Sequence, residues 1–220
     1  MLSPTLHTKE PYILTINKIK KNSKINNMSD ILKSKHEYSP LSGSEHKYQP
    51  QLWNQNHGVK NSHNCYSYAL GNIVKGIKSK AQPGYSSGYE HIELKDYNCK
   101  AFFNRLKKDS PGSYIENFDK QCLPGFYKIF LALDKENDYH WYRQDDNKSW
   151  SHKPGYSNVV DVDAENKKIK NPTLASRDYG YLNYKTPCFF AMSNIDSSII
   201  EIGINAINPV SIIYFRFFVS

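Results

Sequence analysis

A β-hairpin is predicted by the stretch Tyr139-His-Trp-Tyr-Arg-Gln-Asp-Asp-Asn-Lys-Ser-Trp-Ser-His152. Its middle, residues 145–148, is polar and typical of a tight turn between two strands. Successive side chains of a strand point to opposite faces, so His140 and Trp141 lie on different faces of the sheet. A turn of this length sets His152 roughly opposite residues 140 and 141. We therefore expect His140 and His152 to be neighbours.

Further strands are expected on either side of this hairpin. Residues 126–133 are apolar almost throughout, which is typical of a central strand. Residues 159–162 and 168–170 suggest a second, more exposed hairpin. Residues 189–192 and 210–219 are predicted to be late strands. No internal repeat is present.

Two helices are predicted before the strands. Apolar residues recur at helical spacing over residues 65–77, and Asn64 is a natural N-cap, so Cys65 falls in the first turn. Backbone N–H groups and the helix dipole there lower the pKa of a thiol. A loop over residues 82–88 precedes a short amphipathic helix over residues 99–108.

The order of reactive residues indicates acyl chemistry through a thiolate. In this interpretation Cys65 attacks an acyl carbon, His140 accepts the thiol proton, and His152 orients His140. The backbone N–H of Cys65 and one side chain would bind the oxyanion. The candidates for that side chain are Asn61, Gln55 and Tyr66.

These residues resemble the NlpC/P60 and CHAP group of papain-like cysteine hydrolases. The nucleophile block of that group is similar to Asn64-Cys-Tyr-Ser-Tyr-Ala69, and its two hairpin blocks to Tyr139-His-Trp-Tyr142 and Trp150-Ser-His152. The resemblance covers about residues 53–192. It implies an α+β, papain-like fold in which an N-terminal helix carrying Cys packs on an antiparallel sheet carrying His. It also implies a peptidase or amidase with a Cys-His-His triad that forms a thioester and needs no cofactor.

The chain departs from that pattern in ways that leave the substrate open. NlpC/P60 proteins have Asp-Cys-Ser-Gly-Phe where this chain has Asn64-Cys-Tyr-Ser-Tyr68, and their Gly after the catalytic His block is replaced by Trp141-Tyr-Arg143. The expected partner is therefore a peptide, protein or peptidoglycan-like amide. The alternatives are a catalytically silent papain-like binding module and an acyl or amide transferase of the deamidase or transglutaminase type.

Other site types are weaker interpretations of the same residues. A zinc site could use His63, Cys65, His140 and His152, but the paired ligand spacing of structural sites is missing. Arg143, Asp145 and Asp146 are expected to be solvated at a strand edge and turn. Two tryptophans of the hairpin, Trp141 and Trp150, are expected to fill a core.

Composition suggests one domain behind a basic leader. The formal charge is +8, but 25 Lys against 4 Arg, dispersed among Asn, Ile and Tyr, do not form a nucleic-acid-binding stripe. Half of the excess charge falls in residues 1–48, expected to be a flexible leader. Residues 49–220 are expected to form a single catalytic domain with an insertion at about 80–125. No signal peptide or membrane span is apparent, so a soluble protein, cytoplasmic or delivered by a signal-independent route, is predicted.

The four cysteines, Cys65, Cys99, Cys122 and Cys188, are widely spaced. Cys99 and Cys122 could approach each other in a fold, but connectivity cannot be inferred from spacing. Without an export signal, free thiols in a reducing compartment are expected.

Overall fold

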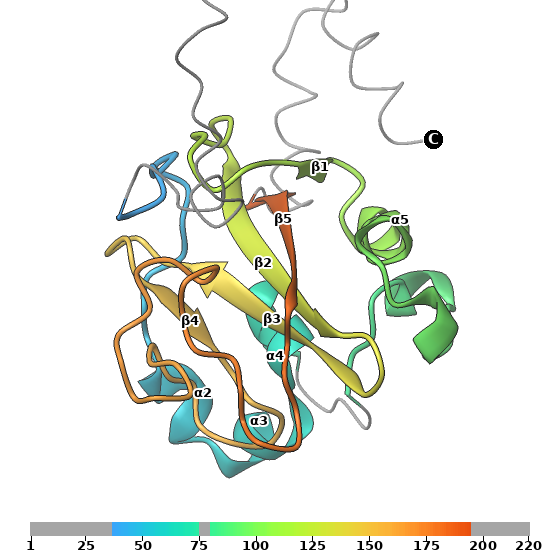
Figure 1. Ribbon diagram of the computed structural model, residues 1–220. Coiled ribbons are helices and arrows are strands. Elements are labelled where there is room, and N and C mark those ends of the chain that lie inside the picture. Colours follow the sequence, from blue (N-terminus) through green and yellow to red (C-terminus); the bar gives the residue numbers. More distant parts are fainter. Residues whose placement is uncertain (1–36, 75–79, 195–220) are drawn as a thin grey trace, which may run out of the picture. The chain divides into compact units, whose positions relative to one another are not determined.

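The computed structural model describes residues 37–74 and 80–194 (Figure 1). Three expectations therefore fall outside the described residues: the strand over 210–219, residues 1–36 of the leader, and the last part of the helix predicted over 65–77.

The centre of the domain is a five-stranded antiparallel sheet in the order β1-β5-β2-β3-β4. The strands are β1 (Tyr114–Ile115), β2 (Phe126–Asp134), β3 (Asp138–Gln144), β4 (Trp150–His152) and β5 (Thr186–Ser193). The predicted β3–β4 hairpin is confirmed, and β2 is central, between β5 and β3. Together with the helices this gives an α+β fold.

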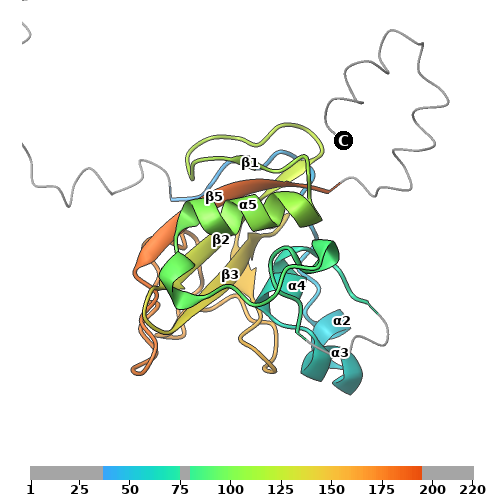
Figure 2. The same ribbon diagram turned by 90° about the vertical axis from the view of Figure 1, so that its right-hand side faces the viewer.

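Both faces of the sheet are covered, which explains why β2 is apolar almost throughout. Leu131 and Trp141 belong to a core cluster that also contains residues of the two helices α4 (Cys65–Ala69) and α5 (Cys99–Asp109). Phe130 belongs to a second cluster beneath the loops that follow β4. Figure 1 shows these loops in orange in front of the sheet and α4 behind it, and Figure 2 shows α5 lying across the strands. The expectation that both hairpin tryptophans are buried is also confirmed, since Trp141 and Trp150 are fully buried.

Helix α4 is shorter than the sequence predicts. Its N-cap is as expected, because the Asn64 side chain accepts a hydrogen bond from the Ser67 N–H, but the helix ends at Ala69 rather than near residue 77. Gly71 has a φ of +67°, a left-handed conformation that ends helices, and the Val74 N–H donates to His63 Nε2 instead of to a helix carbonyl. The helical spacing of apolar residues continues past Ala69, but the backbone is no longer helical there.

The other helices are short except for α5, which matches the helix predicted over 99–108. They are α2 (Gln51–Asn54), α3 (His57–Ser62), and the 3-10 turns η1 (Tyr85–Ser87) and η2 (Leu94–Asp96). No helix among the described residues combines the length and the apolar character needed to cross a membrane.

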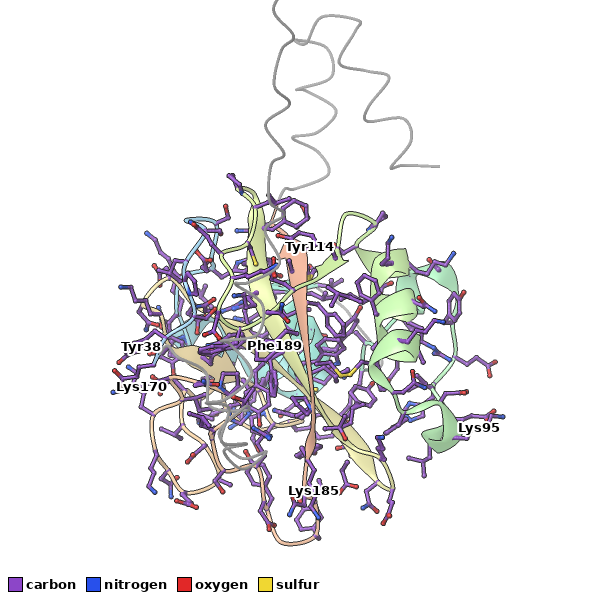
Figure 3. The ribbon with its side chains drawn as sticks, turned by 45° about the horizontal axis from the view of Figure 1, so that its top comes forward. Tyr38, Lys95, Tyr114, Lys170, Lys185 and Phe189 are labelled. Carbon is purple, nitrogen blue, oxygen red and sulfur yellow. A yellow bond between two sulfur atoms is a disulfide. The ribbon has the colours of Figure 1, made fainter. Side chains whose placement is uncertain are left out.

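The described end of the expected leader contacts the domain. Gln144 Nε2 donates to the Ser39 carbonyl at 2.7 Å, and the Asp146 N–H donates to the His46 carbonyl at 3.0 Å. Lys170 lies beside Tyr38 at the edge of the molecule (Figure 3). Residues 37–48 thus pack against the same sheet as the domain expected to begin at residue 49.

A disulfide joins Cys99, the first residue of α5, to Cys188 in β5 (Figure 3, yellow bond). The expectation of four free thiols is therefore wrong for this pair, and Cys99 does not pair with Cys122. The reason is tertiary: Phe103 of α5 stacks on Phe190 of β5, which brings the start of the helix over that strand. Cys65 and Cys122 are free and buried.

Candidate active site

Cys65 and His140 line one cavity of about 510 Å³. The hairpin β3–β4 and the loops after it form one side of the cavity, and the segment after α4 forms the other. Its remaining lining residues are mostly polar or aromatic: Asn64, Lys80, Gln82, His91, Asp138, Tyr139, Pro154, Gly155, Ser157, Tyr179, Tyr181, Leu182 and Tyr184. Lys80, Gln82 and His91 belong to the expected insertion, so this segment borders the cavity of Cys65 and His140.

Cys65 starts α4, and its thiol lies beside the backbone of Trp141 in β3. Backbone hydrogen bonds from Trp141 and Tyr66 act on the thiol, but its burial dominates and raises its pKa to about 12. The sequence predicted a lowered pKa from the helix terminus, and that prediction is wrong because α4 is short and the thiol is buried. Cys65 is therefore a protonated thiol at neutral pH.

The two histidines of the hairpin are in direct contact, as predicted. His140 Nε2 and His152 Nδ1 are 2.8 Å apart, and His152 Nε2 is 2.9 Å from the Val162 carbonyl oxygen. The strand register differs from the prediction, since His152 pairs with Tyr142. His140 and His152 therefore meet diagonally on one face of the sheet.

The Val162 carbonyl fixes the protonation of both rings. A carbonyl only accepts hydrogen bonds, so His152 carries its proton on Nε2 and its Nδ1 is an acceptor. His140 must then donate from Nε2, which leaves the lone pair of its Nδ1 as the basic position. The hydrogen-bonded series therefore runs from the Val162 carbonyl through the ring of His152 to the ring of His140.

Burial keeps both rings neutral. It lowers the pKa of His140 well below its ordinary value, with the nearby His152 acting in the same direction. It also lowers the pKa of His152 to about 4, against the opposing effect of the Val162 hydrogen bond. At neutral pH His140 is an unprotonated base.

None of the three predicted oxyanion side chains lies in the cavity. Asn61 and Gln55 are exposed elsewhere, and the Tyr66 hydroxyl is in the core, where it donates to Asp109 at 2.6 Å. Gln82 lines the cavity instead, and its Oε1 accepts a hydrogen bond from the Tyr139 hydroxyl. With Oε1 engaged by Tyr139, the NH₂ group of Gln82 has no hydrogen-bond acceptor among the described residues.

Gln82 reaches the site through a contact that the sequence does not signal. The N-cap side chain of Asn64 donates from Nδ2 to the Ala81 carbonyl at 2.8 Å. This bond ties residues 81 and 82 to the start of α4. Gln82 stands before a Pro-Gly pair and was predicted only as part of a loop.

Two charged residues of the cavity were also missed. Asp138 accepts a hydrogen bond from the Tyr184 hydroxyl at 2.9 Å, and it makes no ion pair with a Lys or Arg among the described residues. Lys80 Nζ lies 3.9 Å from the centroid of the Tyr156 ring. The cavity therefore presents a carboxylate and an ammonium group.

A buried lysine holds the loop that closes one side of the cavity. Lys153 Nζ donates to the carbonyls of Lys60 and Gly155 at 2.7 Å each and to that of Ser157 at 3.0 Å. Burial lowers its pKa to about 8. The chain turns after β4, since the Ser157 N–H donates to the Pro154 carbonyl at 2.8 Å.

Arg143 and Asp145 are buried rather than solvated, contrary to expectation. Arg143 Nη2 lies 2.9 Å from Asp145 Oδ1, and both side chains are almost fully buried. Arg143 also donates to the Tyr68 hydroxyl at 3.0 Å and to the Tyr68 carbonyl at 3.3 Å. The pair therefore connects α4, which carries Cys65, to the hairpin that carries both histidines.

The zinc interpretation fails on geometry. His63 Nδ1 lies 3.1 Å from the Val59 carbonyl oxygen, and its Nε2 accepts a hydrogen bond from the Val74 N–H. Both ring nitrogens are therefore occupied by backbone groups rather than by a metal ion. Across residues 37–74 and 80–194, no group of three or more His, Cys, Asp or Glu residues could hold a metal ion.

Comparison with known proteins finds a similarity to a shell matrix protein. It is 31% identical over 131 residues to insoluble matrix shell protein 1 of Ruditapes philippinarum, which covers 60% of this chain and 81% of that protein. The chain belongs to the family of that shell matrix protein. No protein-family model and no solved structure matches the chain.

Proposed function

We propose that this protein is a papain-like cysteine hydrolase of the NlpC/P60 and CHAP kind that cleaves an amide bond. Cys65 is the nucleophile, His140 the general base and acid, and His152 the positioning residue. The observation that carries the proposal is the hydrogen-bonded series from the Val162 carbonyl through His152 to His140, because it leaves His140 Nδ1 unprotonated. His140 lines the same cavity as the Cys65 thiol.

The protonation states suit general-base catalysis. Because the Cys65 thiol is protonated, its proton moves to His140 Nδ1 as the sulfur attacks the amide carbon. The C–N bond then breaks, His140 returns the proton to the leaving amine, and a thioester remains on Cys65. Water, deprotonated by His140, attacks the thioester, and the acid and the free thiol are released.

The cavity also offers donors for the oxyanion. The backbone N–H of Cys65 is in the first turn of α4, and the Gln82 amide lines the same cavity. Two such donors stabilise the negative charge that develops on the carbonyl oxygen. Gln82 takes the place of the three side chains that the sequence suggested.

Further support comes from the chain order and the sheet. A helix starting with Cys precedes an antiparallel sheet whose neighbouring strands carry the two histidines, as in papain-like hydrolases. Family membership with a shell matrix protein and the Cys99–Cys188 disulfide favour action in an oxidising, extracellular matrix. The proposed substrate class is therefore an amide in a matrix peptide or protein.

A catalytically silent matrix component is the second candidate. It is favoured by the name of the shell relative and by the raised pKa of Cys65, since a buried protonated thiol is also what an inert core cysteine has. In this case the cavity would bind a ligand without reacting with it.

Thiol labelling separates the two candidates. Alkylation of the full chain by iodoacetamide at pH 7 is followed residue by residue by mass spectrometry, with buried Cys122 as the internal control. The hydrolase predicts that His140→Ala slows alkylation of Cys65 by about 100-fold while Cys122 is unaffected. Equal Cys65 rates in the wild type and His140→Ala would instead identify the silent component.

A further inference from the structure

A second cavity lies directly beside the one that contains Cys65. Its volume is about 730 Å³, and it shares the three lining residues Lys80, Gln82 and His91 with the first cavity. The two cavities therefore adjoin along these residues. The far part of the second cavity is lined by Tyr85 and Tyr89, whose side chains are exposed.

The wall of this second cavity is held in place by one carboxylate. Asp109, the last residue of α5, accepts hydrogen bonds from the Gly84 N–H at 2.6 Å and from the Ser86 N–H at 3.1 Å. It also accepts from the Ser86 hydroxyl and from the Tyr66 hydroxyl of α4. The turn that carries Tyr85 is thereby fixed to the helix that carries Cys65, so the second cavity is preformed.

Part of the backbone of this wall is free to pair with a ligand. Residues 89–93 belong to no helix or strand, and Arg105 donates to the Glu90 carbonyl. Among the described residues, neither the N–H nor the carbonyl of His91 has a hydrogen-bond partner. Exposed backbone of this kind binds extended peptides by adding them as a strand, while neighbouring hollows take alternate side chains. The ring of Tyr89 already faces a cation, since the Arg105 guanidinium lies 5.2 Å from its centroid.

We propose that the second cavity is a substrate subsite that binds an extended peptide chain remote from the bond cleaved at Cys65. The peptide pairs with the backbone N–H and carbonyl of His91 and places a side chain against Tyr85 and Tyr89. This inference rests on the proposed hydrolase function, because that function supplies the reacting end of the peptide. We infer a peptide rather than an isolated small molecule because a peptide can extend from one cavity into the adjoining one along their shared wall.

Length-matched electrophiles test the subsite. The probes are pools of acetylated peptidyl acyloxymethyl ketones with one residue or five residues, compared with iodoacetamide, all acting on Cys65 of the full chain. The five-residue pool is expected to label wild-type Cys65 about tenfold faster than the one-residue pool. Tyr85→Ala and Tyr89→Ala should each reduce that advantage about threefold and leave the iodoacetamide rate unchanged.

Leu174→Ala is the control, because Leu174 is 62% exposed and lines neither cavity. An advantage of the longer probe that survives both Tyr substitutions, or no advantage at all, would overturn the subsite. Loss of His140-dependent iodoacetamide labelling would instead count against the hydrolase. In that event the subsite is tested by fluorescence polarisation of a labelled five-residue peptide pool mixed with Cys65→Ala protein. The subsite predicts that the peptides bind more weakly when Tyr85→Ala is added.

Discussion

The hydrogen bonds of the two ring nitrogens of His152 determine which nitrogen of His140 carries the proton. His152 Nε2 donates to a backbone carbonyl that cannot change its role, so the proton position in His140 follows from it. An orienting group of this kind acts on geometry and tautomer rather than on the substrate.

Substituting His152 by Phe should therefore slow Cys65 alkylation without unfolding the site. Phe keeps a ring of similar size but removes the acceptor at Nδ1, so His140 loses the partner that fixes its tautomer. We expect a decrease of about tenfold or more in the alkylation rate at pH 7, with an unchanged rate at Cys122. His152→Gln, which retains an acceptor, should recover part of the rate. Equal rates for the wild type and His152→Phe would exclude the orienting role.

The pH dependence of Cys65 alkylation follows from the lowered pKa of His140. A base acts when unprotonated, so lowering its pKa keeps it active in more acidic solution. The acidic limb of the rate profile should therefore have its midpoint below the ordinary histidine value of 6.5. Measuring alkylation rates from about pH 4 to pH 8 checks this. A midpoint at or above the ordinary value would show that His140 is not the base.

At the level of elements, the buried ion pair joins α4 to the hairpin. Asp145 accepts from Arg143 Nε at 3.0 Å and also from the Ser151 hydroxyl, while the Arg143 guanidinium lies 4.2 Å from the centroid of the Tyr68 ring. The proposed nucleophile, Cys65, and the proposed base, His140, lie on different elements, and this network fixes one element against the other.

Breaking the ion pair should be far more costly than breaking an exposed one. Asp145→Asn leaves the Arg143 charge buried without its partner, which should lower the free energy of unfolding by about 3–5 kcal/mol in urea titrations. The matched control is Glu165→Gln, whose partner Lys167 is 73% exposed, with an expected cost of about 0–1 kcal/mol. Comparable costs for the two variants would contradict the structural role.

The disulfide between α5 and β5 should contribute strongly to stability. Its 89-residue separation closes a long loop, so Cys188→Ser should lower the free energy of unfolding by about 3–5 kcal/mol. Thiol titration of the unfolded, unreduced chain should detect two free thiols of the four cysteines, those of Cys65 and Cys122. Four titratable thiols would exclude the bond.

For the molecule as a whole, buried neutral histidines predict instability in acid. Burial lowers the pKa values of His46 and His152 to about 4, so between that pH and 6.5 the unfolded chain binds more protons than the folded one. Stability is therefore lost as the pH falls through this window, by about 3 kcal/mol for His152 alone. Asp145 opposes the loss, since burial raises its pKa to about 6.

Urea titrations at pH 7, 5.5 and 4.5 measure this loss. His46→Phe is the control outside the candidate site, since His46 packs edge-on against Tyr127 at 4.6 Å and a phenyl ring can keep that contact. The variant should lose less stability than the wild type over the same pH range, because one proton-binding group of the unfolded chain has been removed. Identical pH profiles would show that His46 does not contribute.

Local features of the sequence predicted much of this arrangement. Alternation and a polar turn predicted the β3–β4 hairpin and the contact between His140 and His152, and Asn64 predicted the start of α4. These features are visible in sequence because strand period, turn chemistry and capping depend on residues only a few positions apart.

Contacts between distant segments decided the rest. The protonated state of Cys65, the burial of Arg143 with Asp145, the choice of Cys188 as partner of Cys99, and the arrival of Gln82 in the cavity each depend on how elements pack. The sequence by itself determined which residues are candidates for the site and the local geometry that holds them. Only the tertiary structure decided their burial and their partners, because desolvation and long-range contacts arise when distant parts of the chain come together.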